Sequence, residues 1–172
     1  FDKVARMLKL GYPGGPLIEE KARLGNALAH RFPRAFLEKG SLDFSFSGLK
    51  TSVRNIISKR ETGEIPILSD SDISAGFQKA VIDVLTDKVF LACEKEKVNR
   101  IVVTGGVAAN SVLRKRIAAE ADSHGLKSFF PKPDFCTDNA AMIACAGYYK
   151  SLNKPLSLKD TLNLDAKASL KL

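Results

Sequence analysis

The stretch with the clearest chemical potential is residues 101–110, Ile-Val-Val-Thr-Gly-Gly-Val-Ala-Ala-Asn. Its first four residues have the pattern of a buried strand and Asn110 precedes a helical pattern, so Gly105 and Gly106 occupy a strand-to-helix turn. Glycines lack a Cβ atom and let a ligand approach the main chain, and a helix start offers free N–H groups. The turn fits a nucleotide site and, equally well, a tight connection between packed elements. Its spacing matches neither a P-loop nor a dinucleotide fingerprint.

The carboxylate of Asp138 is the second candidate. It follows Cys136 and Thr137 and precedes a run of small, apolar residues with a helical pattern. Thr137 or Asp138 could cap that helix, which the spacing favours. Alternatively, the carboxylate could bind a metal ion or a phosphate.

Composition limits the partners. With 27 Lys and Arg against 19 Asp and Glu, the net charge is +8, which permits attraction to a polyanion such as tRNA but is also common in soluble domains. Basic residues cluster at Arg54, Lys59 and Arg60, at Lys95 and Lys97, and at Arg114, Lys115 and Arg116. No apolar run approaches the ~20 residues of a membrane span, so no membrane association is predicted. Three cysteines without Cys-x-x-Cys spacing predict neither a zinc site nor a disulfide framework and fit a reducing cytoplasm.

The elements that must position these residues follow from hydrophobic periodicity and turn signals. Ser69, Asp70 and Ser71 offer N-caps for the longest helix. The last hundred residues predict an α/β domain with a parallel pair of strands, because helices and strands alternate. Helices are predicted at 2–10, 17–30, 49–60, 72–97, 110–124 and 138–152, and strands at 42–47, 100–104 and 127–130.

Five motifs, in this order, resemble the C-terminal half of the tRNA adenosine threonylcarbamoyltransferases, a family formerly labelled O-sialoglycoprotein endopeptidase or glycoprotease. The resemblance runs from residue 1 to about residue 150. Because Phe1 is not an initiator methionine and the chain opens inside a helical pattern, we expect a part of a longer protein. The motifs are Phe1-Asp2-Lys3-Val4-Ala5, Tyr12-Pro13-Gly14-Gly15-Pro16, Asp43-Phe44-Ser45-Phe46-Ser47-Gly48-Leu49-Lys50-Thr51, Thr104-Gly105-Gly106-Val107-Ala108-Ala109-Asn110 and Phe135-Cys136-Thr137-Asp138-Asn139.

The resemblance implies a fold. It is one lobe of an actin-like ATPase (ASKHA) fold, with RNase-H-like topology and a mainly helical insertion. Residues 1–70 would be the insertion and its return to the sheet, residues 71–152 the C-terminal RNase-H-like lobe, and residues 153–172 a tail.

The resemblance also implies a reaction, the transfer of a threonylcarbamoyl group from its adenylate to the adenosine beside the tRNA anticodon. Asp2 and Gly15 match residues that contact the threonylcarbamoyl-adenylate, and Gly105, Gly106 and Asn110 match the nucleotide-binding segment. Asp2 could instead favour the dipole of a helix start, Gly15 could form a turn, and Asn110 could cap a helix. The implied partners are tRNA, threonylcarbamoyl-adenylate or ATP, an inactive paralogue and a small P-loop ATPase.

Asp138 matches the family's metal-binding aspartate, which implies one iron or zinc ion per full-length chain. The family's His-x-x-x-His motif is absent, because the two histidines, His30 and His124, lie in unrelated contexts. We therefore expect this chain alone to hold no tightly bound ion and to be inactive, and we identify no catalytic residue in it.

Two other functions stay open. One is a non-enzymatic nucleotide- or RNA-binding module of the same fold. The other is the older metalloendopeptidase label, which is least favoured because the chain has no His-Glu-x-x-His.

Overall fold

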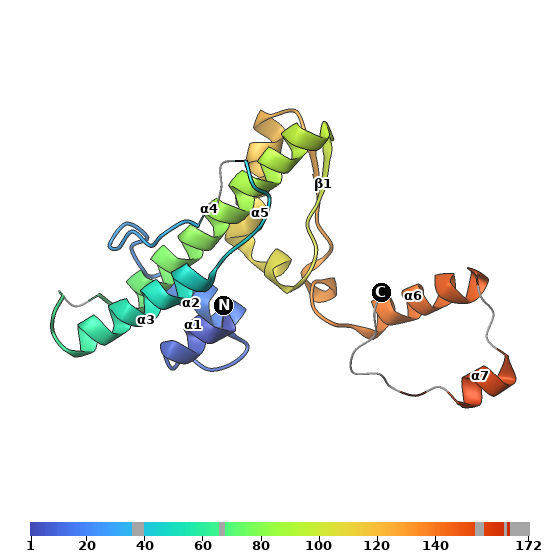
Figure 1. Cartoon of the computed structure of the whole chain (residues 1–172), viewed down its shortest axis with the longest axis horizontal. Helices are drawn as coiled ribbons and strands as arrows, with labels where there is room; N and C mark the ends of the chain where they lie inside the picture. The colour runs from blue at the N-terminus through green and yellow to red at the C-terminus, as the bar shows by residue number, and fades with distance from the viewer. Residues whose placement is uncertain (36–39, 66–67, 154–156, 164, 166–172) are drawn as a thin grey trace. The chain divides into compact units, whose positions relative to one another are not determined.

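The computed structural model describes residues 1–35, 40–65, 68–153, 157–163 and 165. The chain divides into two compact units, Phe1–Cys136 (unit 1) and Thr137–Leu172 (unit 2). It is an α/β structure that is mostly helical (Figure 1). The elements are α1 (Asp2–Met7), α2 (Gly14–Ala22), α3 (Ser47–Glu61), α4 (Asp70–Glu96), β1 (Arg100–Val102), the 3₁₀ helix η1 (Gly106–Ala109), α5 (Ser111–Ser123), β2 (Lys127–Phe129), the 3₁₀ helix η2 (Pro133–Phe135), α6 (Ala140–Asn153) and α7 (Leu158–Leu162).

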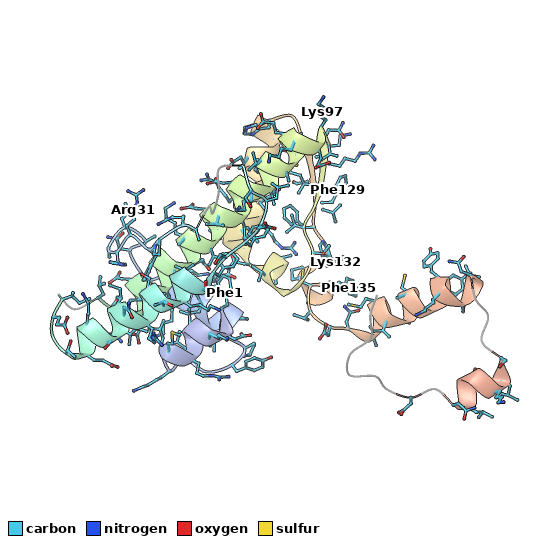
Figure 2. All side chains as sticks on the ribbon, in the orientation of Figure 1. Phe1, Arg31, Lys97, Phe129, Lys132 and Phe135 are labelled. Carbon is cyan, nitrogen blue, oxygen red and sulfur yellow. The ribbon has the colours of Figure 1, made fainter. Side chains whose placement is uncertain are left out.

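Helix α4 organises unit 1, and its local sequence sets both of its ends. The Ser69 hydroxyl accepts the Asp72 N–H at 3.0 Å, and the Asp72 carboxylate accepts the Ser69 N–H at 3.2 Å, which together form a capping box. Lys97 closes the other end in a left-handed conformation with φ of 53° (Figure 2). The prediction of a long helix that begins at Ser69–Ser71 is confirmed.

Two hydrophobic cores lie along α4, one on each half of the helix. Near its N-terminal half, Ile73, Phe77 and Val81 pack with side chains from α1, α2 and α3. Near its C-terminal half, Ile82 and Cys93 pack with β1 and α5. The two cores meet near the middle of α4, where Val81 and Ile82 are adjacent and Leu85 packs against both.

The predicted parallel strands are confirmed. β1 and β2 pair in parallel, with Ile101 opposite Ser128 and Val102 opposite Phe129. Strand alternation places Ile101 in the core, whereas Val102 and Phe129 are exposed. Phe129 is labelled on β2 in Figure 2.

Helix α2 is shorter than the predicted helix over residues 17–30. It ends at Ala22 because the chain turns to pass the start of α4. At Gly25 a Cβ atom would lie 2.0 Å from the Ser71 carbonyl oxygen, and the Asn26 N–H donates to Asp72 at 2.7 Å. The main-chain contact with α4 therefore replaces further helical turns.

The predicted strand at 42–47 is wrong. Residues 42–46 lie outside helices and strands, and α3 already begins at Ser47. The Lys88 ammonium of α4 donates to the Ser41 carbonyl at 2.6 Å, and Lys95 donates to the Gly40 carbonyl. Two lysine side chains of α4 thus bind the main chain just before this segment.

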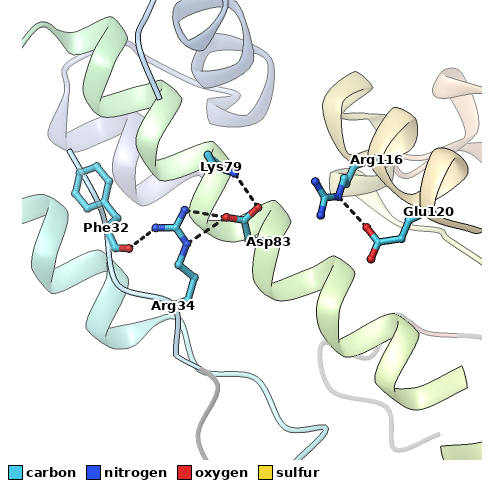
Figure 3. A network of polar contacts seen from close by, with 6 residues as sticks. All are labelled: Phe32, Arg34, Lys79, Asp83, Arg116 and Glu120. Atoms are coloured by element: carbon cyan, nitrogen blue, oxygen red, sulfur yellow. Dashed lines mark hydrogen bonds and ion pairs between the residues drawn. The ribbon is translucent and has the colours of Figure 1, made fainter. Parts of the chain in front are cut away.

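A polar network fastens the segment after α2 to the middle of α4 (Figure 3). Arg34 donates to the Asp83 carboxylate at 2.8 and 3.2 Å and to the Phe32 carbonyl at 2.6 Å, and Lys79 donates to Asp83 at 3.2 Å. Partial burial raises the pKa of Asp83, but the hydrogen bonds from Arg34 and Lys79 outweigh it and leave this pKa below the ordinary value.

Unit 2 contains α6 and α7, and the end of the predicted tail lies outside the described residues. The division into an insertion, a lobe and a tail at residues 70 and 152 concerns the family's lobes and stays a prediction. Among the described residues, no helix is long and apolar enough to cross a membrane.

Candidate nucleotide site and metal ligand

The glycine pair forms an open turn between β1 and α5. Gly105 has φ of 89° and ψ of 172°, a conformation that is essentially reserved for glycine. A Cβ atom at either Gly105 or Gly106 would meet nothing within 4 Å. Residues 104–107 are exposed, and no hydrogen bond joins the main-chain N–H of Gly106 or Val107 to another described residue. These main-chain groups are therefore accessible to a ligand.

Asn110 is the N-cap of α5. Its Oδ1 atom accepts the N–H groups of Val112 at 3.1 Å and Leu113 at 3.0 Å. Its Nδ2 atom donates to Oε1 of Gln78 at 2.8 Å, and both amides are buried. The capping role is thus observed, and one Nδ2 hydrogen of Asn110 is left for another acceptor.

The expectation of free N–H groups at the start of α5 is wrong. The Ser111 N–H donates to Glu19 at 3.1 Å, and Asn110 accepts the next two. The Ser111 hydroxyl also donates to the same Glu19 oxygen. A protein carboxylate therefore already occupies the positive end of this helix.

Sequence reasoning missed Glu19 and Gln78. Gln78 carried a usable signal, because a polar amide inside the apolar pattern of α4 needs a buried partner. Glu19 lies four residues after Gly15, so both are on one face of α2. Nothing local to Glu19 indicated its partner, which is 92 residues away in the chain.

Arg114 of α5 connects the glycine turn to the segment that follows β2. Its guanidinium donates to the carbonyls of Ala108 at 2.5 Å and Pro131 at 2.7 Å, and to Sγ of Cys136 at 3.1 Å. It also lies over the Phe130 ring at 5.3 Å. Arg114 therefore braces the turn and does not belong to a freely solvated basic cluster.

Asp2 and the Gly14–Gly15 segment meet at the start of α2. The Gly14 N–H donates to Oδ1 of Asp2 at 2.8 Å. A Cβ atom at Gly14 would lie 2.6 Å from Cα of Asp2, whereas at Gly15 it would meet nothing within 4 Å. Gly14 is therefore required by packing, and Gly15 leaves an open surface. Helix α2 links this surface to the start of α5, because Glu19 accepts hydrogen bonds from Ser111.

Asp138 lies in unit 2. It is exposed, and no hydrogen bond or ion pair joins its side chain to another described residue. Oδ1 of Asn139 accepts the Met142 N–H at 2.9 Å, so Asn139, and not Thr137 or Asp138, caps α6.

The described residues contain no group of three His, Cys, Asp or Glu side chains that could hold a metal ion. His30 packs edge-on against Phe32, with ring centroids 4.6 Å apart. Nδ1 of His124 lies 2.8 Å from the Glu120 carbonyl. One carboxylate does not fit a complete metal site.

Comparison with known proteins gives a consistent result. A family model described as tRNA N6-adenosine threonylcarbamoyltransferase matches residues 1–145. A protein of that name from Clostridium beijerinckii is 48% identical over 172 residues, which are 100% of this chain and 50% of the relative. Those from Desulfitobacterium hafniense and Moorella thermoacetica are each 51% identical, over 90% and 92% of this chain and 45% and 47% of the relatives. The chain spans about half the length of the curated relatives it matches.

Proposed function

The chain belongs to the tRNA N6-adenosine threonylcarbamoyltransferase family, and from this premise we propose that it supplies the adenosine side of a threonylcarbamoyl-transfer site. The accessible main chain at Gly105 and Gly106, next to the buried cap of α5, carries the proposal. The fold would be the C-terminal lobe of an actin-like protein, with the rest of the site on segments of the longer relatives.

The charges around α5 favour a nucleoside over a phosphate at this place. The Glu19 carboxylate sits on the first N–H of α5, so a second anion there would be repelled. Ribose hydroxyls and the adenine edge, in contrast, offer donors for Glu19 and acceptors for the main-chain N–H groups of Gly106 and Val107. The phosphate of the adenylate would therefore point away from α5.

The proposed reaction is an acyl transfer in which the N6 amine of the tRNA adenosine attacks the threonylcarbamoyl carbonyl carbon. A carbon–nitrogen bond forms, the bond from that carbon to the adenylate oxygen breaks, AMP leaves and the amine loses a proton. The part of this chain is to bind and orient the adenylate, which lowers the entropic cost of bringing the reactants together. Gly15 would leave room for the same ligand.

We also propose that Asp138 contributes one oxygen ligand to an iron or zinc ion in proteins of full family length. The ion would polarise the attacked carbonyl. The tRNA, the paralogue and the P-loop ATPase are proposed partners on the same family basis.

Substitution of Gly106 by valine tests the proposed binding of a nucleotide at the glycine turn. The new side chain meets no protein atom at its Cβ, so the melting temperature should change little while the affinity for ATP or the adenylate falls. Calorimetric titration measures the affinity, and Gly147→Val, another site where a Cβ meets nothing within 4 Å, is the control. Unchanged affinity in folded Gly106→Val would refute the assignment.

Elemental analysis tests the proposed metal binding by Asp138 without an activity assay. This chain should hold no stoichiometric iron or zinc, and a full-length relative about one ion per chain. The substitution equivalent to Asp138→Ala should lower that content, whereas the one equivalent to Asp134→Ala, an exposed carboxylate four residues earlier, should not. A tightly bound ion in this chain alone would contradict the proposal.

A further inference from the structure

Helix α3 presents a polar face to the outside of unit 1. Leu49, Val53 and Ile57 bury its inner face in the N-terminal core. Gly48, Thr51, Asn55 and Lys59 recur every three or four residues and therefore form one outward stripe. From Gly48 to Lys59 the stripe is about 16 Å long.

A shallow groove of about 610 Å³ follows this stripe. The lining is mostly polar and carries no negative charge. It consists of hydroxyls, an amide, a lysine, a histidine, a glycine and one partly buried isoleucine, with no carboxylate. The lining residues are His30, Ser47, Gly48, Thr51, Ser52, Asn55, Ile56 and Lys59.

The charged residues of α3 are mostly basic. The helix has four basic residues and a single acidic one, Glu61 at its last position. Arg60 is held by Asp70 at 2.6 Å, but no ion pair joins Arg54 or Lys59 to another described residue. Both are exposed, so their charge is available to a partner.

We propose that the outward face of α3 binds the phosphodiester backbone of RNA, with Arg54 and Lys59 as the charged contacts and Thr51 and Asn55 as neutral ones. Cationic, hydroxyl and amide side chains are the groups that contact phosphate and sugar oxygens. The groove has no Phe, Tyr or Trp on which bases could stack, so binding should not depend on base sequence. This proposal rests on the proposed function, which makes tRNA the substrate.

Equilibrium binding of this chain to unmodified tRNA, and to an unrelated RNA of equal length, tests the proposal across a series of salt concentrations. Arg54→Ala/Lys59→Ala removes two contacts, so affinity should fall roughly 5- to 30-fold for both RNAs. The slope of log affinity against log salt should become shallower by about 1.4 to 1.8. Asn55→Glu should weaken binding by repulsion, whereas Asn55→Gln should not.

The matched control is Arg100→Ala/Lys127→Ala, an exposed Arg–Lys pair in register on the small sheet. This pair removes the same charge at the other end of α4, so its effect on affinity should be small. Circular dichroism confirms that each variant is folded.

Equal losses in the α3 and control variants would overturn the proposal, as would a wild-type chain that binds polyglutamate but no RNA. A specific loss only for tRNA would also overturn it, because base recognition would then be required. The nucleotide titration with Gly106→Val is independent of all three outcomes, so failure of this surface and failure of the proposed function are distinguishable.

Discussion

Replacement of Asn110 by alanine separates the structural role of this residue from its proposed ligand role. The substitution removes the cap from two N–H groups of α5, at a cost of roughly 1 kcal/mol. It also leaves Oε1 of Gln78 without a donor in a position where the residue is only 6% exposed. An unpaired buried acceptor costs about 1–3 kcal/mol. The unfolding free energy should therefore fall by about 2–4 kcal/mol.

Chemical denaturation of Asn110→Ala, Gln78→Leu and the double variant measures both contributions. In the Gln78→Leu background no acceptor is stranded, so Asn110→Ala should cost only the cap, about 1 kcal/mol. A loss below about 0.5 kcal/mol in the single Asn110→Ala variant, or equal losses in the two backgrounds, would refute this reasoning.

Asn110→Asp completes the test, because it keeps the capping oxygen and the Gln78 amide can turn to donate to it. The fold should then be retained. A new carboxylate beside Glu19 should nevertheless weaken adenylate binding, as measured by calorimetric titration. Unchanged adenylate affinity in this folded variant would show that the ligand does not approach Asn110.

Three other perturbations have definite expected outcomes. Gly25→Ala should destabilise unit 1 by about 3 kcal/mol or more in a denaturant titration, because its Cβ would lie 2.0 Å from the Ser71 carbonyl oxygen; a near-neutral effect would mean that α2 and α4 can separate freely. Gly105→Ala should lower the free energy of unfolding by about 1–3 kcal/mol because of the positive φ of Gly105, whereas Gly106→Ala should change it by no more than about 0.5 kcal/mol. Similar losses of stability in the two variants would contradict the described turn. Hydrogen bonds from the Asn26 N–H and Ser69 lower the pKa of Asp72 below its ordinary value, so its contribution to stability is present above the unfolded pKa and is lost as the pH falls through the folded pKa. Asp72→Asn should thus be less stable than wild type at pH 7, and a denaturant titration should show the difference shrinking as the pH falls below about 4.

Features encoded by neighbouring residues could be predicted from the sequence. The start of α4 depends on Ser69 and Asp72, which are three residues apart, and the parallel pair follows from the order of helices and strands. The open glycine turn at Gly105 was also visible, because its conformation is a property of the residue itself.

Features that depend on distant partners could not be predicted. The alternation at residues 42–47 resembles a strand, but Lys88, 47 residues from Ser41, binds the carbonyl there. The start of α5 looked free because its partner, Glu19, is 92 residues earlier. In both cases a side chain satisfies main-chain groups, and no local pattern specifies such pairings. The roles of Asp2, Gly15 and Asp138 toward a ligand stay predictions.

The contact between Glu19 and Ser111 has a consequence for biosynthesis. During translation α2 emerges long before α5, and the loop that joins them must close over 92 residues before this contact forms. Such long-range closure comes late in folding. The proposed nucleotide site is therefore incomplete in the nascent chain until unit 1 has folded, and a ligand of that site would stabilise only molecules in which α2 and α5 have docked.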